Sequence, residues 1–293
     1  MDQPRNGGPP NHLPSTFIVG PSSHHTHSIL LLHGLGSNGH KFGSELIQCA
    51  ICSNGKTLPE LLPGARFIFP TSKRRRSSAF SRAKLTQWFD IASLDDPSYR
   101  SHTQTQGLEE SYVEILGIIK QEMEKVPCKN IVLGGLSQGC AMGLVCLLSI
   151  NFPIGGFIGM SGWLPFQDDI DYLLNVSGDD TAEDDPFGSD SAEEEALDLE
   201  VKVLNYIRVL LSIDNPKPLS RKDSALATPV FLGHGDADEK VHPSLGEQAY
   251  QTMKDIGFQA DWKRYEGQGH WYKIPEEIDD IVGFIQTKVG WPI

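Results

Sequence analysis

A Gly-x-Ser-x-Gly pentapeptide at 135–139 limits the folds open to this chain of 293 residues more than any other feature. An apolar run, NIVLGG at 130–135, leads into it, and the stretch 138–151 that follows is apolar on nearly every side. The first run is typical of a buried strand and the second of a buried helix. A strand that turns into a helix in this way predicts a sheet with Ser137 at the end of a strand.

The rest of the chain alternates short apolar runs with longer stretches of helical period, which is typical of consecutive βα units. We therefore predict an α/β fold, in which a mostly parallel central sheet is flanked by helices. The predicted strands are 29–33, 66–69, 130–135, 155–162, 229–235 and 258–265, and the predicted helices are 107–125, 138–151, 244–256 and 276–289.

The N-terminal stretch 1–28, rich in Pro, Gly, Ser and His, predicts a flexible arm before a single domain at 29–290. We expect its histidines His24, His25 and His27 to be solvated rather than to bind a metal. Neither a signal peptide nor a transmembrane helix is expected. Five cysteines cannot all pair with one another, which favours reduced thiols and a cytoplasmic protein.

Ser137, flanked by glycines at a strand-to-helix turn, is predicted to be a nucleophile on a strained elbow. A serine hydroxyl is a weak nucleophile and needs a histidine base that is held by a carboxylate. On this architecture the three residues follow one another in the order Ser, Asp or Glu, and His. His270 fits the base, because its Gly-rich loop lies between a predicted strand and the last helix, from which its ring can reach Ser137.

Two carboxylates, Asp236 and Asp238, follow the predicted strand that ends at 235. We select Asp238 as the partner of the histidine, because residues beyond the end of that strand turn toward the site. Asp236 lies closer to the strand and is expected to brace the loop. The histidines His234 and His242 lie too near Asp238 in sequence to reach the elbow easily.

The developing negative charge of the reaction requires two backbone N–H donors. One is the N–H of Gln138, directly after the nucleophile. The other is predicted to be the N–H of Leu35, in the glycine-containing loop HGLGSNGH at 33–40. The loop follows the first predicted strand, and its glycines let the chain bend toward the site.

Most of the net charge of −13 comes from one segment. Residues 168–200 contain 14 of the 38 acidic residues and none of the 25 basic ones, which leaves 24 acids and 25 bases elsewhere. This near-neutral remainder does not resemble a nucleic-acid-binding surface. The segment belongs to an insertion at 166–226, whose first half is typical of disordered chain and whose second half, at 192–213, predicts an amphipathic helix. Two interpretations stay open: a surface insertion, or a cap beside the active site.

Six short motifs, in this order along the chain, resemble those of the acyl-protein thioesterase and carboxylesterase family, also called lysophospholipase-like. The similar stretches lie within residues 28–165 and 228–290. The motifs are HGLG at 33–36, WFDI at 88–91, GLSQG at 135–139, SGWLP at 161–165, HGDAD at 234–238 and YEGQGH at 265–270.

The resemblance implies an α/β-hydrolase fold and a serine hydrolase without cofactor or metal. Members of the family hydrolyse thioesters of palmitoylated proteins, small carboxylic esters or lysophospholipids. The residues that it assigns are the triad Ser137, Asp238 and His270, the oxyanion donors Leu35 and Gln138, and the substrate contacts Trp88, Trp163 and Leu164.

The sequence departs from the family pattern in three places. Ser37 stands where relatives usually carry Asp, which leaves the chemistry untouched. Lys73 and the three arginines 74–76 form a basic cluster that is either a solvated loop or a surface for an anionic membrane or a nuclear import receptor. The stretch 166–226 is longer than the loop of relatives, and this loop lies close to the acyl-binding region there.

Three hypotheses about function follow from these observations. The leading one is removal of S-palmitoyl groups from protein cysteines through an acyl-serine intermediate. The second is hydrolysis of small esters or lysophospholipids. In the third the hydrolase body is a non-catalytic scaffold whose acidic insertion recruits a basic partner. The partners expected are S-acylated proteins or small acyl esters, with transient contact to a membrane surface and no nucleic acid.

Overall fold

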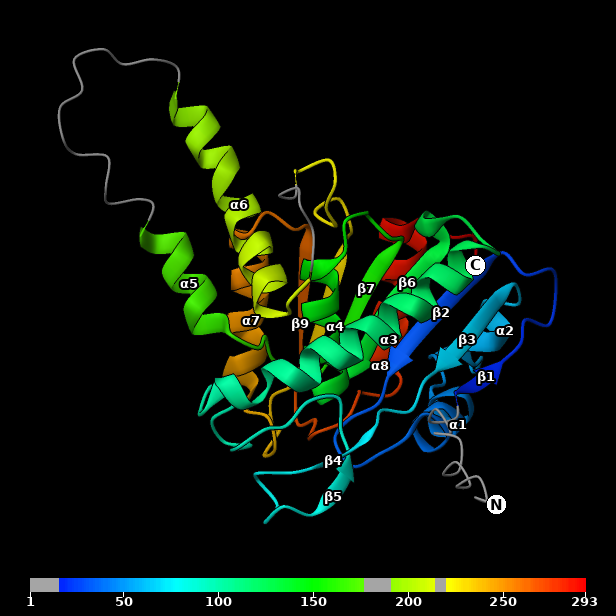
Figure 1. Ribbon diagram of the computed structural model, residues 1–293. Helices are drawn as coiled ribbons and strands as arrows, with labels where there is room; N and C mark the ends of the chain where they lie inside the picture. Colours follow the sequence, from blue (N-terminus) through cyan, green and yellow to red (C-terminus); the bar gives the residue numbers. More distant parts are fainter. Residues whose placement is uncertain (1–15, 177–190, 214–219) are drawn as a thin grey trace, which may run out of the picture.

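The computed structural model describes residues 16–176, 191–213 and 220–293, and a seven-stranded sheet runs through its centre (Figure 1). Six strands form parallel ladders, and the edge strand β1 alone pairs antiparallel. All six predicted strands are confirmed. Across the sheet the order is β1 (Phe17–Val19), β3 (Ala65–Phe69), β2 (His27–Leu32), β6 (Ile131–Leu136), β7 (Gly156–Met160), β8 (Val230–Gly235) and β9 (Ala260–Tyr265).

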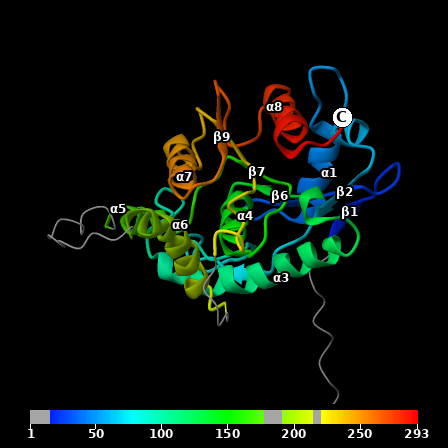
Figure 2. The same cartoon turned by 90° about the horizontal axis from the view of Figure 1, so that it is seen from above.

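Helices cover both faces of this sheet. They are α1 (Gly39–Cys49), α2 (Leu58–Leu61), α3 (Thr105–Met123), α4 (Gln138–Ser149), α5 (Gln167–Val176), α6 (Ser191–Leu210), α7 (Pro243–Asp255) and α8 (Glu276–Phe284). Seen from above, α3, α4 and α6 lie on one side of the sheet and α1 and α8 on the other (Figure 2). The four predicted helices are confirmed as α3, α4, α7 and α8, the last continuing as a π-turn over Ile285–Val289.

The strand β2 shows why the central strands are apolar without alternation. Leu30 and Leu32 pack into the hydrophobic core on the α3–α4 side, while Ile29 and Leu31 pack into the core on the α1–α8 side. Because helices cover both faces, the side chains of β2 after its first residue are all buried, as in other parallel sheets. The carboxyl ends of β2, β6 and β8 lie at the same edge of this sheet. The candidate site residues follow these strand ends in the sequence.

The N-terminal arm predicted over residues 1–28 is wrong at its C-terminal end. Phe17–Val19 form β1, which pairs with β3 in the register Phe17 to Phe69. The ring of Phe17 lies 5.9 Å from that of Phe69 and 4.9 Å from that of His40. The sequence did not predict this strand, because it is only three residues long and gains its stability from this tertiary packing. Residues 1–15 lie outside the described part of the chain.

A two-stranded hairpin leaves the main sheet between β3 and α3 and was not predicted. Its strands β4 (Arg74–Arg76) and β5 (Lys84–Thr86) pair antiparallel. The hairpin contains three residues of the basic cluster. From composition alone, a solvated loop is one of the interpretations of this cluster. It lies below the sheet in the view of Figure 1.

The insertion contributes two helices. The amphipathic helix predicted at 192–213 is confirmed as α6, which packs on α4 through Val203, Leu204 and Ile207, all at most 1% exposed. The disorder predicted for the first half is wrong at its start, because α5 is helical over Gln167–Val176 and buries Ile170 completely. Residues 177–190 and 214–219, which include much of the acidic segment, lie outside the described residues, so the cap interpretation is not tested there.

Candidate active site

Ser137 occupies a strained turn between β6 and α4. Its φ of 58° and ψ of −123° are unfavourable for a residue with a side chain, and strain of this kind costs about 1–3 kcal/mol. The N–H of Ser137 donates to the Met160 carbonyl of β7 at 2.8 Å and helps to hold the turn. A Cβ on Gly139 would lie 2.1 Å from the Leu32 carbonyl oxygen, so the pentapeptide needs glycine there.

The structure brings Ser137, His270 and Asp238 into one chain of hydrogen bonds. Ser137 Oγ lies 2.9 Å from His270 Nε2, and His270 Nδ1 lies 2.7 Å from Asp238 Oδ2. The loop after β9 that carries His270 packs on the end of β8, where a Cβ on Gly235 would lie 2.2 Å from the Gln268 carbonyl oxygen. This is the geometry of a Ser-His-Asp triad, in which a histidine can take the serine proton while a carboxylate orients its ring.

The Asp238 carboxylate is fully enclosed and accepts four hydrogen bonds. Oδ1 accepts from the N–H groups of Lys240 (2.8 Å) and Val241 (3.0 Å). Oδ2 accepts from His270 and from His234 Nε2 at 3.1 Å. Burial alone would raise the pKa of Asp238, but the hydrogen bonds from the two histidines and Val241 outweigh it and hold the pKa well below its usual range. The carboxylate is therefore ionised beside His270.

The other candidates of this region take different places. Asp236 accepts a hydrogen bond from the Gly267 N–H at 2.7 Å, so it braces the loop that leads to His270. His242 is the N-cap of α7 and accepts from the Ser244 N–H. Neither side chain has a hydrogen bond to Ser137.

The two predicted oxyanion donors flank Ser137. Gln138 is the first residue of α4, where an N–H has no acceptor within its own helix. The loop with Leu35 lies against the serine, because a Cβ on its neighbour Gly34 would lie 3.3 Å from Ser137 Cβ. The N–H of Gly36 donates to the Thr86 carbonyl of β5 at 2.8 Å. The hairpin thus holds the loop that carries Leu35.

Trp88 lies behind this loop. It is 1% exposed, and its indole N–H donates to the His33 carbonyl at 2.8 Å. The Gln138 side chain joins the same network, accepting from the Trp88 N–H and donating to the Phe89 carbonyl. Burial lowers the pKa of His33 to about 4, which leaves its Nε2 free to accept from the Ser72 N–H. Trp88 therefore supports the oxyanion loop from behind.

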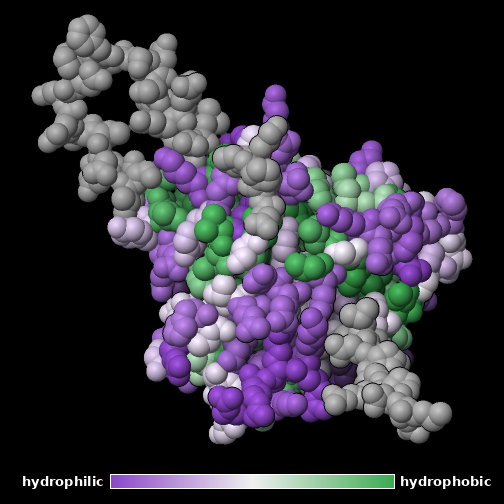
Figure 3. Space-filling view, in the orientation of Figure 1, coloured by the Kyte–Doolittle hydropathy of each residue, from purple (hydrophilic) through white to green (hydrophobic). Residues whose placement is uncertain are grey.

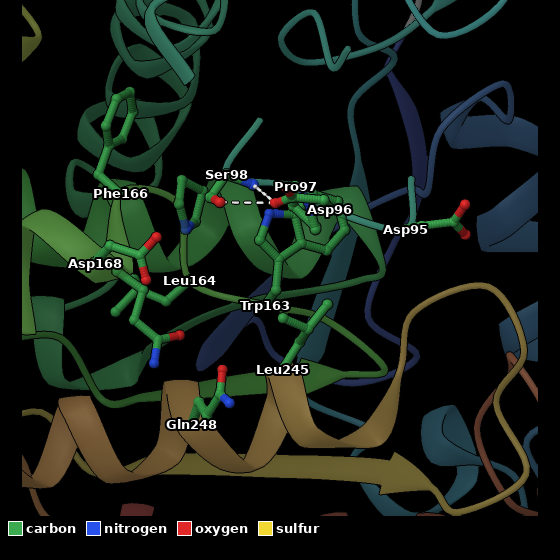
Figure 4. A pocket seen from close by; sticks show the side chains of 12 residues that line it. Asp95, Asp96, Pro97, Ser98, Trp163, Leu164, Phe166, Asp168, Leu245 and Gln248 are labelled. Atoms are coloured by element: carbon green, nitrogen blue, oxygen red, sulfur yellow. Dashed lines mark hydrogen bonds between the residues drawn. The ribbon is translucent and has the colours of Figure 1, made fainter. Parts of the chain in front are cut away.

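A cavity of about 140 Å³ is lined by Trp163 and Leu164, two of the predicted substrate contacts, while none of the three triad residues lines it (Figure 4). Trp88 is not among its lining residues. Leu245 and Gln248 point into the cavity from α7. Asp95, Asp96 and Asp168 are also among its lining residues, and the Asp96 carboxylate accepts hydrogen bonds from the N–H and the hydroxyl of Ser98.

Within the part of the chain that the structure describes, no group of three or more His, Cys, Asp or Glu side chains is arranged to hold a metal ion. In the histidine tract, His25 contacts Ser28 Oγ and the His27 ring lies 4.2 Å from the Trp291 ring at an angle of 38°, so these two side chains pack on the fold. All five cysteines are free thiols. Cys52, Cys140 and Cys146 are buried, whereas Cys49 is exposed.

Comparison with known proteins gives one large family match. The model of the phospholipase/carboxylesterase family matches residues 13–197, and that of the prolyl oligopeptidase family matches 174–291. The acyl-protein thioesterase 1 of Gibberella zeae is 28% identical over 92% of this chain and 93% of its own length, and that of Neurospora crassa is 26% identical over 93% and 91%. The crystal structure of Zea mays acyl-protein thioesterase 2 is 25% identical and covers 94% of this chain and 100% of its own, with a TM-score of 0.63.

Three residues of the site escaped sequence reasoning. His234 hydrogen bonds to Asp238, Thr86 anchors the oxyanion loop, and His33 accepts from Ser72 across 39 residues. Only His234 had a signal in the sequence, since it stands four residues before Asp238. The other two contacts join segments that the sequence gives no reason to pair.

Proposed function

The chain belongs to the phospholipase/carboxylesterase family, and on that premise we propose that it hydrolyses acyl esters and thioesters through an acyl-Ser137 intermediate. The resemblance that the six motifs carry is thereby confirmed, and the protein is an esterase of the α/β-hydrolase fold. The proposal for the residues rests on one observation, the unbroken hydrogen-bond chain from Ser137 through His270 to the ionised Asp238.

In the proposed reaction His270 Nε2 takes the proton of Ser137 Oγ as this oxygen attacks the acyl carbonyl. The imidazolium then protonates the leaving thiolate or alkoxide, and the acyl group remains on Ser137. Water enters, His270 removes one of its protons, and the acyl-enzyme bond breaks to release a carboxylic acid. Asp238 holds the ring and stabilises its positive charge in both halves of the cycle.

The N–H groups of Gln138 and Leu35 are the proposed donors to the oxyanion. In serine hydrolases, the removal of one preorganised donor of this kind raises the activation free energy by about 2.7–4 kcal/mol. Two constraints support the assignment: helix α4 begins at Gln138, and the hairpin fixes the loop of Leu35 through Gly36 and Thr86. The buried Trp88 is hydrogen-bonded to both segments, and it therefore holds Gln138 and the loop of Leu35 in fixed positions relative to each other.

The substrate class that we propose is S-acylated protein, since the relatives in fungi and maize are named acyl-protein thioesterases. The leaving group is then a cysteine thiolate, which needs less protonation than an alkoxide. The acyl chain would enter the cavity between Trp163 and α7. We place this activity in the cytoplasm, and the nucleus is a second location that microscopy of the tagged chain can test.

The β4–β5 hairpin is the surface that we propose to contact membranes. Lys73 and Arg75 are paired with acidic residues of α3, so they contribute little net charge. The remaining basic side chains of the hairpin are exposed, and so is Phe80 at its tip (43%). The surface around α3 and the hairpin is strongly hydrophilic (Figure 3). A basic rim around one aromatic side chain suits an anionic lipid surface, with each basic residue contributing about 1 kcal/mol.

Binding to vesicles containing phosphatidylserine tests this surface. We expect Phe80→Ser to weaken the sedimentation of the protein with such vesicles. Tyr99→Ser, a change at an exposed aromatic (56%) that does not belong to the hairpin, is the matched control and should bind as the natural protein does. Equal binding of all three proteins would contradict the membrane proposal and leave the hydrolase proposal intact.

A small-ester carboxylesterase is the second candidate, and the size of the cavity favours it. A cavity of about 150 Å³ holds a single benzene ring, and the cavity lined by Trp163 and Leu164 has about 140 Å³. A complete palmitoyl chain exceeds that space, so this conformation accepts a short acyl group or the first part of a long one. Rates for p-nitrophenyl esters from C2 to C16, beside a palmitoyl-cysteine peptide, separate the two candidates.

Labelling by a fluorophosphonate probe tests the reaction itself. The probe should modify Ser137, and Ser137→Ala should abolish labelling and lower kcat about 10⁵- to 10⁶-fold, as removal of the nucleophile does in other serine hydrolases. Ser161→Ala is the control and should still be labelled; this serine has a φ of 47°, and its buried hydroxyl has no hydrogen-bond partner among the described residues. Full hydrolysis by Ser137→Ala would overturn the proposal and favour the scaffold.

A further inference from the structure

A second histidine, His234 at the end of β8, lies in the interior beside the triad. Its side chain is completely buried between α7 and β9. A Cβ on Gly246 of α7 would lie 2.3 Å from its Nδ1, and the Trp262 ring of β9 lies 6.1 Å away, centroid to centroid. Packing on both sides fixes the plane of this ring, although the proposed reaction gives it no part.

The contacts of His234 assign its tautomer. Nε2 lies 3.0 Å from the carbonyl oxygen of Val241 and 3.1 Å from Asp238 Oδ2. A carbonyl oxygen only accepts, so Nε2 carries the proton and shares it between the two oxygens. Nδ1 is buried and has no hydrogen-bond partner among the described residues, so a second proton there would be unsatisfied. The ring is therefore a fixed donor directed at Asp238.

The two oxygens of Asp238 are held differently. Oδ1 is fixed by two backbone N–H groups of its own turn, those of Lys240 and Val241. Oδ2, which receives the Nδ1–H of His270, has one further donor, the Nε2–H of His234. Without His234, Oδ2 would keep only its hydrogen bond with His270, and the two N–H groups on Oδ1 alone would hold the carboxylate in place.

We propose that His234 is a positioning residue of the triad, whose Nε2–H holds Asp238 Oδ2 where it receives the Nδ1–H of His270. The inference rests on the proposed function, since it concerns the same site. His234 acts through Asp238 and touches neither substrate nor Ser137. Because Nε2–H also donates to the Val241 carbonyl, His234 links the carboxylate to the loop that leads into α7.

Two substitutions of similar volume separate donation from packing. His234→Gln keeps an N–H at the reach of Nε2, whereas His234→Leu fills the space without a donor. We expect the Leu variant to lower kcat for a p-nitrophenyl ester about 10- to 100-fold with KM unchanged, by analogy with the loss found when a group that orients a metal ligand is removed. The Gln variant, which keeps the donor, should retain most of the activity of the natural protein.

A double-mutant cycle with Asp238→Asn measures whether the two substitutions are coupled. A purely structural role of His234 would not produce such coupling in kcat. If His234 acts through the carboxylate, His234→Leu should cost little further activity once Asp238 is Asn, because residues that act as a unit are not additive. His242→Leu, the same change at an exposed histidine, is the matched control and should leave kcat unchanged. Melting temperatures of all variants report the packing.

Two results would overturn the proposal: a Leu variant as active as the natural protein, or a loss that persists at full size in the Asp238→Asn background. Should the Leu variant fail to fold, His234→Asn replaces it, because its shorter amide does not reach Asp238; equal activity of the Asn and Gln variants then refutes the proposal. Failure of the proposed function looks different, since the natural protein itself would then resist labelling at Ser137.

Discussion

Asp238 and Glu277 are buried carboxyl groups on either side of strand β8, and their surroundings differ in the number of hydrogen-bond donors. Asp238 receives four. Glu277, 0% exposed in α8, receives one, from the Lys273 N–H at 2.9 Å, and its Oε1 has no partner among the described residues. Burial raises the pKa of Glu277 to about 8, and the nearby Asp280 adds to the effect.

The comparison shows that donors, not depth, set the charge of a buried carboxyl group in this protein. Both groups lose the solvation of water, which favours the neutral acid. At Asp238 the histidines and backbone N–H groups more than replace that solvation, so the anion persists. At Glu277 a single donor does not, so the acid is mostly protonated at neutral pH. Only the first environment suits a group that must stabilise an imidazolium.

Neutralising the two carboxyl groups in turn should give the largest contrast. Asp238→Asn removes the charge beside His270 and favours the wrong tautomer of its ring, so we expect kcat to fall about 10⁴-fold. Glu277→Gln should leave kcat within about twofold, because Glu277 is already protonated and has no contact with the triad. Steady-state hydrolysis of a p-nitrophenyl ester checks both. A comparable loss in the two variants would break the comparison.

The stability of the natural protein should fall as pH rises, because of Glu277. The folded-state pKa of about 8 lies above that of about 4.3 in an unfolded chain, so the folded protein binds an extra proton between these values. The stabilisation is complete below pH 4.3 and is lost as pH rises through 8. Glu277→Gln removes this dependence, and its melting temperature relative to the natural protein should therefore rise by several degrees between pH 5 and pH 8.

Calorimetry of the Gln variant across this range is the measurement. Asp280→Asn, a change at a half-buried neighbour whose charge raises the pKa of Glu277 only in part, serves as the control and should shift the profile less. A melting temperature of Glu277→Gln that runs parallel to the natural protein from pH 5 to 8 would show that Glu277 is charged after all.

The opposite pH dependence is expected for Asp238, with a smaller effect. Its folded-state pKa is lowered, so its contribution to stability is complete above the unfolded-state pKa of about 3.9 and is lost as pH falls below it. The natural protein should therefore lose more stability than Asp238→Asn between pH 5 and pH 3. Urea unfolding at both pH values gives the difference, and an equal loss in both proteins would refute the expected anion.

The order of the catalytic residues and most of the sheet could be predicted, because these features depend on local patterns. The apolar run before 135, the glycines around Ser137 and the Gly-rich loop of His270 each indicate a backbone geometry without reference to the rest of the chain. The choice of Asp238 over Asp236 also followed from distance beyond the strand end, and the structure brings Asp238, not Asp236, to His270.

The places of Trp88 and the β4–β5 hairpin could not be predicted from local pattern. Family resemblance assigned Trp88 to the substrate, yet its indole is bonded to the His33 carbonyl behind the oxyanion loop. The hairpin is composed of basic residues with no alternation, and it forms because Lys73 and Arg75 pair with α3 while Thr86 binds the loop of Gly36. These contacts join residues between 35 and 55 positions apart, so no short window of sequence contains both partners.

The sequence by itself determined a parallel sheet, a serine on a strained turn, and a histidine and carboxylate in the order that a serine hydrolase requires. Local sterics and hydrophobic period suffice for these, since a glycine or an apolar repeat acts on its own neighbourhood. Tertiary structure alone decided that His234 joins Asp238, that Glu277 remains a neutral acid, and that a cavity of about 140 Å³ forms between Trp163 and α7. Each of these depends on how many donors, and how much volume, distant segments bring to one point.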